Sequence, residues 1–277
     1  MHPADPSAIP SYRAAPARTR SLVRVALDWL AMTGALLYWG ILGLLVTIIC
    51  GTLSFALPRK AGERFGRQVH HYIFRYFVVY LDATGLLKVD LSALEKLGRI
   101  STPIIVAPNH ASLWDAVFII ARLPQAICVM KNAILRNPFL GGGSRLSGYI
   151  PNGATPRMIR DAADALRRGG QLLLFPEGTR TRPCERWINP LKGGCALIAL
   201  RARVPVYPVF IRSNTRFLQK GWPLWRPPTF PIEIDISVGE PLLPEGDESA
   251  SKFTRRLQRV YDQELAKSHP LRRQTGV

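Results

Sequence analysis

The longest uncharged stretch of the chain runs from Trp29 to Leu57 and is mostly apolar. As one helix, these 29 residues would be about 43 Å long, whereas a bilayer core is about 30 Å thick. The stretch is therefore too long for a straight span. It predicts either a single tilted span or a segment that enters and leaves on the cytoplasmic side. Basic residues flank both ends, so the positive-inside rule assigns no orientation.

Residues 61–81 mix aromatic and aliphatic side chains with basic ones, which favours a helix lying in a membrane interface. The adjacent His70 and His71 point to different faces of such a helix, so we expect solvated or headgroup-facing histidines rather than a metal site. Residues 29–84 are therefore assigned to N-terminal membrane-associated helices. Residues 1–28, which begin rich in Ala, Pro, Ser and Arg, are expected to form a flexible basic arm.

Beyond residue 100, short β-branched runs alternate with helical stretches. The predicted strands are 104–107, 127–130, 172–175, 204–211 and 232–238. Predicted helices follow Ser112, run from a Thr155–Pro156 cap to Arg168, cover Ala196–Arg203 and cover Phe253–Ala266. This alternation predicts an α/β fold, a mixed sheet covered by helices, over residues 85–247. Residues 248–277 are expected to form a C-terminal amphipathic helix and a basic tail.

The charge of the chain narrows its possible partners. With 37 Lys and Arg against 19 Asp and Glu, the net charge is +18, which suits nucleic acid or an anionic membrane surface. The uncharged stretch favours the membrane. The chain contains no zinc knuckle, RNP-like motif or basic-aromatic ladder, so we expect no nucleic-acid partner. Its four cysteines form no metal-ligand spacing and are expected to be reduced thiols in or near the core: Cys50, Cys128, Cys184 and Cys195.

The first candidate for chemistry is the segment N-H-A-S-L-W-D, residues 109–115, at the end of an apolar strand. An imidazole can act as a general base near neutral pH when a carboxylate orients it. Residues five apart on one helix are separated by about 140°. His110 and Asp115 can therefore meet only if His110 lies in the turn before a helix and Asp115 lies in its first turn. For this motif alone, a capping Asp beside an unrelated surface His is the simpler alternative.

The second candidate is F-P-E-G-T-R-T, residues 175–181, after another apolar strand. Gly178 permits close backbone approach to a ligand, and Thr179 supplies a hydroxyl. Arg180 can hold a phosphate through two hydrogen bonds. Glu177 could hold the loop or accept a hydrogen bond from a ligand hydroxyl. An ordinary polar turn explains this motif equally well by itself.

Two further features lie downstream. Lys192-Gly193-Gly194 stands at a helix start, where main-chain N–H groups favour anions. In V-P-V-Y-P-V, residues 204–209, the prolines predict a strand at a sheet edge or bulge that borders a groove. A plain edge strand is the alternative.

Taken together, N-H-x4-D, then F-P-E-G-T-R with Glu177 67 residues after His110, then the lysine-glycine helix start and V-P-V-x-P-V resemble the glycerolipid acyltransferase family. That family includes 1-acylglycerol-3-phosphate acyltransferases and other lysophospholipid acyltransferases. The likeness covers about residues 85–245. It implies a membrane-bound O-acyltransferase that moves a fatty acyl group from acyl-CoA or acyl carrier protein to a lysophospholipid hydroxyl. The favoured acceptor is 1-acyl-sn-glycerol-3-phosphate.

The resemblance also implies residue roles. His110 would take the proton from the acceptor hydroxyl, and Asp115 would orient and charge-stabilise His110. Arg180 would hold the acceptor's phosphate, in a loop shaped by its neighbours. The implied substrate-binding set is Lys131, Glu177, Gly178, Thr179 and Arg180. No metal, cofactor or acyl-enzyme intermediate is implied, and the sequence has no G-x-S-x-G nucleophile elbow.

The implied surroundings are a lipid membrane, of the bacterial inner-membrane type, with the catalytic domain facing the cytoplasm. One segment departs from the family. Members often carry G-x-I-F-I-D-R, whereas this chain has Asn152 and Gly153 where the acid and the arginine would stand. Arg157 or Arg160 could supply the charge from the next helix. Otherwise the acceptor differs, for example an amino-acid lyso-lipid or a specialised lipid product.

Overall fold

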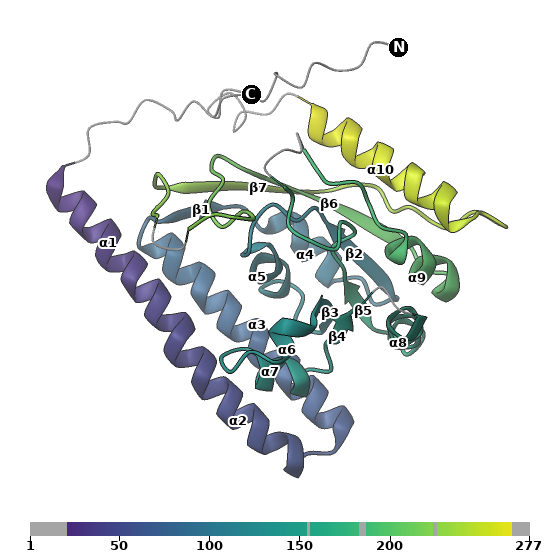
Figure 1. The fold of residues 1–277 in the computed structure, drawn as a ribbon, viewed down its shortest axis with the longest axis horizontal. Helices are drawn as coiled ribbons and strands as arrows, with labels where there is room; N and C mark the ends of the chain where they lie inside the picture. Colours follow the sequence, from purple (N-terminus) through teal and green to yellow (C-terminus); the bar gives the residue numbers. More distant parts are fainter. Residues whose placement is uncertain (1–20, 154–155, 183–186, 224–225, 268–277) are drawn as a thin grey trace.

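A sheet of seven strands forms the centre of the computed structural model, which describes residues 21–153, 156–182, 187–223 and 226–267 (Figure 1). In spatial order the strands are β1 (Leu87–Val89), β7 (Ile232–Val238), β6 (Val206–Ser213), β2 (Ile104–Pro108), β5 (Gln171–Leu173), β3 (Ala126–Lys131) and β4 (Ile150–Asn152). Neighbours pair in parallel, apart from the antiparallel pair β6 and β7. The predicted mixed α/β sheet is confirmed. β1 and β4 were not predicted, because three residues are too few to show a period.

Helices cover both faces of the sheet, which is why every residue of β2 is buried and nearly all are apolar. One face packs against α3 (Arg59–Ala83), α4 (Ser92–Gly98) and α5 (Asp115–Ile120). The other packs against α8 (Pro156–Arg167), α9 (Gly194–Ala202) and α10 (Ala250–Ala266) (Figure 1). The short helices α6 (Asn132–Leu135) and α7 (Gly141–Leu146) connect β3 to β4. The predicted cap residue Thr155 lies outside the described residues, although α8 does begin at Pro156.

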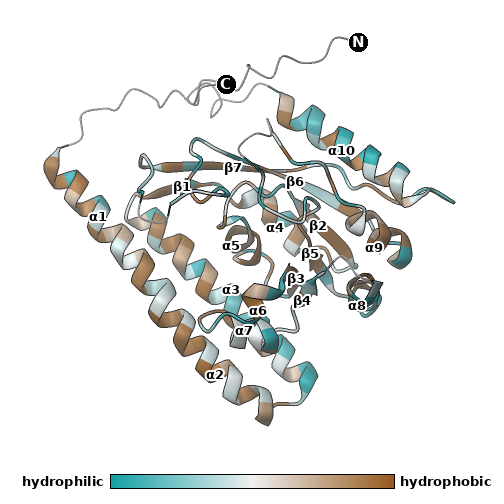
Figure 2. Ribbon diagram, in the orientation of Figure 1, coloured by the Kyte–Doolittle hydropathy of each residue, from teal (hydrophilic) through white to brown (hydrophobic). Residues whose placement is uncertain are grey.

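The N-terminal segment is one 35-residue helix, Leu22–Ala56, made of α1 (Leu22–Leu37), the π-helical turn η1 (Tyr38–Leu42) and α2 (Gly43–Ala56). Figure 2 shows hydrophobic residues along most of its length. By length and composition it could cross a membrane. The arm predicted for residues 1–28 is too long, since the helix already begins at Leu22. Ser21 caps this start, and an ion pair between Arg24 and Asp28 stabilises the first turns.

Helix α3 buries one face in the core and exposes the other. Phe74, Phe77 and Leu81 belong to the core, whereas Phe65, Tyr72, Tyr76 and Val79 on the outer face are exposed. The expectation for the histidine pair is wrong, because both imidazoles are buried. His71 Nδ1 lies 3.0 Å from the Ile120 carbonyl, and His70 Nδ1 lies 2.9 Å from the Gly66 carbonyl. These contacts replace the solvent that a surface histidine would need.

Three consecutive glycines bring α7 against α2 and α3. A Cβ on Gly142 would lie 2.3 Å from the Thr47 carbonyl oxygen, and one on Gly143 would lie 2.9 Å from His70 Cε1. A larger residue at Gly142 would push the backbones of α7 and α2 apart, and one at Gly143 would displace the His70 ring. The long apolar helix is therefore attached to the α/β domain by direct backbone packing.

Strand β6 lies between β7 and β2, so of the two positions predicted from its prolines, a sheet edge or a bulge, the edge is wrong. Pro208 is tolerated there because the antiparallel ladder with β7 ends at the Val209–Val238 pair. The Pro208 carbonyl accepts a hydrogen bond from Gly239 N, and the next contact on that side is the isolated bridge between Val206 and Leu242. The missing N–H of Pro208 thus falls in an interruption of the ladder.

Candidate active site

His110 and Asp115 meet at the carboxyl end of β2. His110 lies in the loop before α5, and Asp115 is the first residue of that helix. His110 Nδ1 is 3.0 Å from Asp115 Oδ2, which also accepts a hydrogen bond from Ser112 N at 2.7 Å. The Asp115 side chain is 0% exposed and that of His110 is 17% exposed. The turn-then-helix geometry expected from the sequence is present, while the catalytic role of the pair stays a prediction.

This contact determines which nitrogen of His110 is free. Because an ionised carboxylate can only accept, Nδ1 donates to Asp115 and Nε2 is left without a proton in the neutral ring. Burial raises the pKa of the Asp115 carboxyl, and the hydrogen bonds from His110 and Ser112 oppose that rise. The Phe175 ring stacks on the imidazole with centroids 3.9 Å apart. The site therefore holds an oriented imidazole whose Nε2 can accept a proton.

Glu177 joins the two sequence motifs. Its Oε1 accepts a hydrogen bond from His110 N at 2.6 Å, and its Oε2 accepts one from Asn189 N at 2.8 Å. The Thr181 hydroxyl lies 3.0–3.1 Å from both oxygens. Burial raises the pKa of Glu177, opposed by these hydrogen bonds. The residue is 1% exposed and both of its oxygens accept hydrogen bonds within the protein, so it supports the loop, while its predicted contact with substrate stays a prediction.

Two more buried contacts hold the end of β2. Asn109 continues the strand with its side chain, because its amide nitrogen donates to the Ile211 carbonyl and its amide oxygen accepts from Ile211 N. From α10, the Tyr261 hydroxyl donates to the Ala107 carbonyl. Both contacts come from residues more than one hundred positions away in the chain. They fix the backbone that carries His110.

The loop after β5 carries the candidate anion-binding residues. Gly178 has φ +67°, in the left-handed region that favours glycine, and the Lys192 side chain packs over it. Arg180 donates from Nη1 to the Leu218 and Gln219 carbonyls at 2.8 and 3.2 Å. In the described part of the chain, its Nε and Nη2 have no hydrogen-bond partner. Arg180 is therefore oriented by the protein with one side of its guanidinium available.

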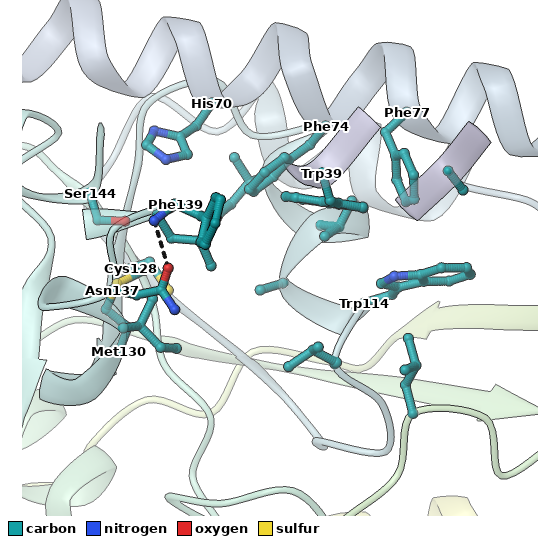
Figure 3. Close-up of a pocket in the computed structure, with 18 of the residues that line it drawn as sticks. Trp39, His70, Phe74, Phe77, Trp114, Cys128, Met130, Asn137, Phe139 and Ser144 are labelled. Atoms are coloured by element: carbon teal, nitrogen blue, oxygen red, sulfur yellow. Dashed lines mark hydrogen bonds between the residues drawn. The ribbon is translucent and has the colours of Figure 1, made fainter. Parts of the chain in front are cut away.

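An apolar cavity of about 420 Å³ opens beside this site (Figure 3). It lies between α1, α3, α5 and β3, and its lining includes Leu113 and Leu218 from two loops. Aromatic residues form much of its wall: Trp39, Phe74, Phe77, Trp114 and Phe217. Its volume and lining suit a small, elongated apolar group.

Comparison with known proteins points to one family. Residues 88–212 match the Acyltransferase family. A 1-acyl-sn-glycerol-3-phosphate acyltransferase of Pseudomonas aeruginosa is 23% identical over 266 residues, which cover 93% of this chain and 96% of that protein. A chloroplastic enzyme of the same name from Brassica napus is 25% identical over 57% of this chain and 47% of its own length. These matches support the glycerolipid acyltransferase family for this chain.

A solved structure of a 1-acyl-sn-glycerophosphate acyltransferase shares the fold of this chain. The crystal structure of PlsC, the 1-acyl-sn-glycerophosphate acyltransferase of Thermotoga maritima, matches with a TM-score of 0.65 at 21% identity. The match covers 91% of this chain and 100% of that one. By contrast, the chain spans about half the length of the plant and yeast relatives.

The remaining predicted residues of the acyltransferase follow the carboxyl ends of β3 and β4. Lys131 ends β3, and its register partner in β4 is Asn152. Lys131 is exposed and forms no hydrogen bond or ion pair with the other candidate residues that the structure describes. Arg157 and Arg160 are also exposed on α8, where Arg157 pairs with Asp161 at 3.7 Å. The structure leaves both arginines at the surface near these strand ends without assigning them to the site.

Sequence reasoning missed the cavity of the acyltransferase. Met32, Ala35 and Trp39 line it at helical spacing, but they sit in a helix that is apolar on every side, so no period distinguishes a cavity face from a lipid face. The π-helical turn that contains Trp39 is a local irregularity of the kind often found at functional sites. No feature of the sequence of that turn predicts its π-helical conformation.

Proposed function

We propose that this protein transfers a fatty acyl group from acyl-CoA or acyl carrier protein to the hydroxyl of a lysophospholipid, with 1-acyl-sn-glycerol-3-phosphate as the favoured acceptor. The observation that carries the proposal is the His110–Asp115 contact at 3.0 Å beside an apolar cavity. The family match and the names of the relatives support the reaction class.

In this reaction Nε2 of His110 accepts the proton of the acceptor hydroxyl while the oxygen attacks the thioester carbonyl carbon. The carbon–sulfur bond then breaks, and the thiolate that leaves takes the proton back from the imidazolium. Asp115 stabilises the imidazolium between these two transfers. The protein residues bind, orient and move a proton, and no covalent intermediate forms on the chain.

The cavity is the proposed binding site of the acyl chain. Two of its lining residues, Leu113 and Leu218, lie next to His110 and Arg180, since Leu113 N donates to the Leu218 carbonyl and Arg180 Nη1 donates to that same carbonyl. An acyl chain in the cavity would therefore bring its thioester to the side of the sheet where Arg180 could hold an acceptor phosphate.

The proposed location is the inner membrane, with the α/β domain on the cytoplasmic side. Most of the long helix is exposed and apolar, including Leu30, Ile41, Ile48 and Phe55. The net charge of +18 would attract anionic lipids and anionic thioester donors. Membranes that retain the protein after a high-salt wash would support insertion, whereas release by salt alone would contradict it.

The decisive experiment supplies defined thioester donors and lyso-lipid acceptors to the purified protein in lipid nanodiscs and identifies the products by mass spectrometry. Wild type should form phosphatidic acid from 1-acyl-sn-glycerol-3-phosphate. His110→Ala should lower the rate at least about a hundredfold, with an unchanged thermal midpoint. Near wild-type activity in His110→Ala would remove the mechanism.

A different acceptor is the second candidate, favoured by the lack of the family's acid and arginine in residues 148–153, which end in Asn152 and Gly153. The same assay decides it when the acceptor panel contains an amino-acid lyso-lipid. Acylation of that lipid at a higher kcat/KM than the phosphate-bearing acceptor would replace the first candidate. The reverse order would retain it.

A further inference from the structure

Leu218, in the loop between β6 and β7, has an unfavourable backbone conformation. Its φ is +60°, in the left-handed region that residues other than glycine rarely adopt. Among the described residues, Arg203 at the end of α9 is the only other non-glycine residue with a positive φ. Such a conformation persists only where surrounding contacts hold it, and it is frequent at functional sites. The contacts that hold Leu218 therefore indicate what its conformation serves.

The carbonyl of Leu218 accepts hydrogen bonds from two other loops. Its donors are Leu113 N at 3.2 Å and Arg180 Nη1 at 2.8 Å. One residue earlier, the Phe217 carbonyl accepts from the Ser112 hydroxyl at 3.2 Å. Rotating Leu218 out of the left-handed region would move its carbonyl relative to both donors. The position of the Arg180 guanidinium therefore depends on the conformation of Leu218.

Leu218 also lines the apolar cavity. The residue is 5% exposed and belongs to the same buried apolar cluster as Trp114 and Phe217, which line the cavity with it. The Phe217 ring meets the Trp114 ring edge to face, with centroids 5.3 Å apart, so this part of the wall is closely packed. Leu218 therefore contributes its carbonyl to the proposed phosphate site and its place in the wall to the proposed acyl site.

We propose that Leu218 is a positioning residue that couples the two sites, so that an acyl chain in the cavity tightens phosphate binding at Arg180. A chain in the cavity contacts the Leu218 side chain, and a phosphate meets the oriented guanidinium, only while Leu218 keeps its left-handed conformation. A ligand that binds one conformation more tightly than the others raises the population of that conformation. Each ligand therefore favours the conformation that the other one binds, and the effect is equal in both directions.

The inference rests on the proposed function, because it takes the cavity as the acyl site and Arg180 as the phosphate site. Its consequence is a preference for the loaded donor. A donor that carries its acyl chain tightens the binding of the acceptor phosphate, whereas the same donor without the chain leaves that binding unchanged.

The test is the dissociation constant of sn-glycerol 3-phosphate, measured by calorimetry on the full-length protein in lipid nanodiscs. One series contains saturating S-hexadecyl-CoA, a thioether that cannot transfer its chain, and the other contains saturating CoA, which has the same anionic groups and no chain. For wild type, the hexadecyl compound should lower the dissociation constant at least about fivefold relative to CoA. Glycerol 3-phosphate should in turn tighten the binding of S-hexadecyl-CoA by the same factor, relative to its effect on CoA.

Leu218→Gly separates the side chain from the backbone, because glycine adopts the left-handed region without strain and keeps the carbonyl that holds Arg180. This variant should remove the difference between the two CoA compounds while glycerol 3-phosphate binds in the presence of CoA as tightly as to wild type. Leu218→Asn also tolerates the left-handed region and should remove the difference as well. Two controls should keep it: Leu218→Met retains an apolar side chain in the wall, and Arg203→Gly changes the other left-handed residue, outside the cavity lining.

Three results would overturn the inference. They are equal dissociation constants with both CoA compounds in wild type, undetectable binding of glycerol 3-phosphate, and an undiminished difference in folded Leu218→Gly and Leu218→Asn. A purely structural role for Leu218 would weaken phosphate binding equally with either compound. Transfer rates separate this inference from the proposed function. Acyl transfer together with equal constants refutes the inference alone, whereas unequal constants without transfer to any acceptor refute the proposed function alone.

Discussion

Replacing Asp115 with asparagine separates the charge of this residue from its shape. An amide oxygen at the position of Oδ2 can still accept from His110 Nδ1 and Ser112 N, so the imidazole keeps its orientation. The variant loses the attraction between a carboxylate and the imidazolium that forms during proton transfer. At 3.0 Å and an effective dielectric constant of about 20, this attraction is about 5 kcal/mol. Because 1.36 kcal/mol corresponds to tenfold in rate, kcat should fall about a thousandfold to ten-thousandfold.

The assay measures kcat with donor and acceptor both saturating, beside the thermal midpoint of each variant. The midpoint of Asp115→Asn should stay close to that of wild type, since a buried amide costs less to desolvate than a buried carboxylate. Asp161→Asn is the matched control, because its carboxylate pairs with Arg157 on an exposed helix face. A folded Asp115→Asn protein within tenfold of wild-type kcat would refute the electrostatic argument.

Two further variants test the second motif. Arg180→Gln should raise the KM for a phosphate-bearing acceptor about tenfold to a hundredfold with a smaller change in kcat. The control variant Arg201→Gln, at the far end of α9, should change neither quantity. An equal rise in KM for a phosphate-free acceptor would contradict the role assigned to Arg180. Burial raises the pKa of Glu177 above its ordinary 4.5, so the folded state binds the carboxyl proton more tightly than the unfolded chain does. The stability that comes from this tighter proton binding is lost as the pH rises through the folded-state pKa. Glu177→Gln lacks that titration, so the difference in thermal midpoint between wild type and variant should shrink as the pH rises above 4.5, and a constant difference would count against the assignment.

Local signals predicted the parts of the site that depend on nearby residues. The β7 strand was expected at its observed bounds, because Ile232, Ile234 and Ile236 alternate with less buried residues. The meeting of His110 and Asp115 followed from a strand end and a helix start only a few residues apart. In both cases the deciding interaction lies within one short segment.

Features that depend on distant segments were not predictable in the same way. Glu177 is buried because its partners at His110 and Asn189 come from two other loops, and nothing in its own motif indicates them. His70 sits among basic and aromatic residues that favoured a membrane interface, yet α7 covers it through its glycines. Pro208 was expected at a sheet edge or a bulge, and its own segment does not show that the ladder with β7, more than twenty residues later, is interrupted at that point.

The hydrogen bond from Tyr261 to Ala107 has a consequence for the order of events during synthesis. The two residues are 154 positions apart, so at about 5–20 residues per second the end of β2 waits about 8–30 s for this partner. The apolar helix Leu22–Ala56 leaves the ribosome long before Tyr261 does. The backbone that carries His110 therefore lacks this part of its support until α10 has been synthesised and has docked.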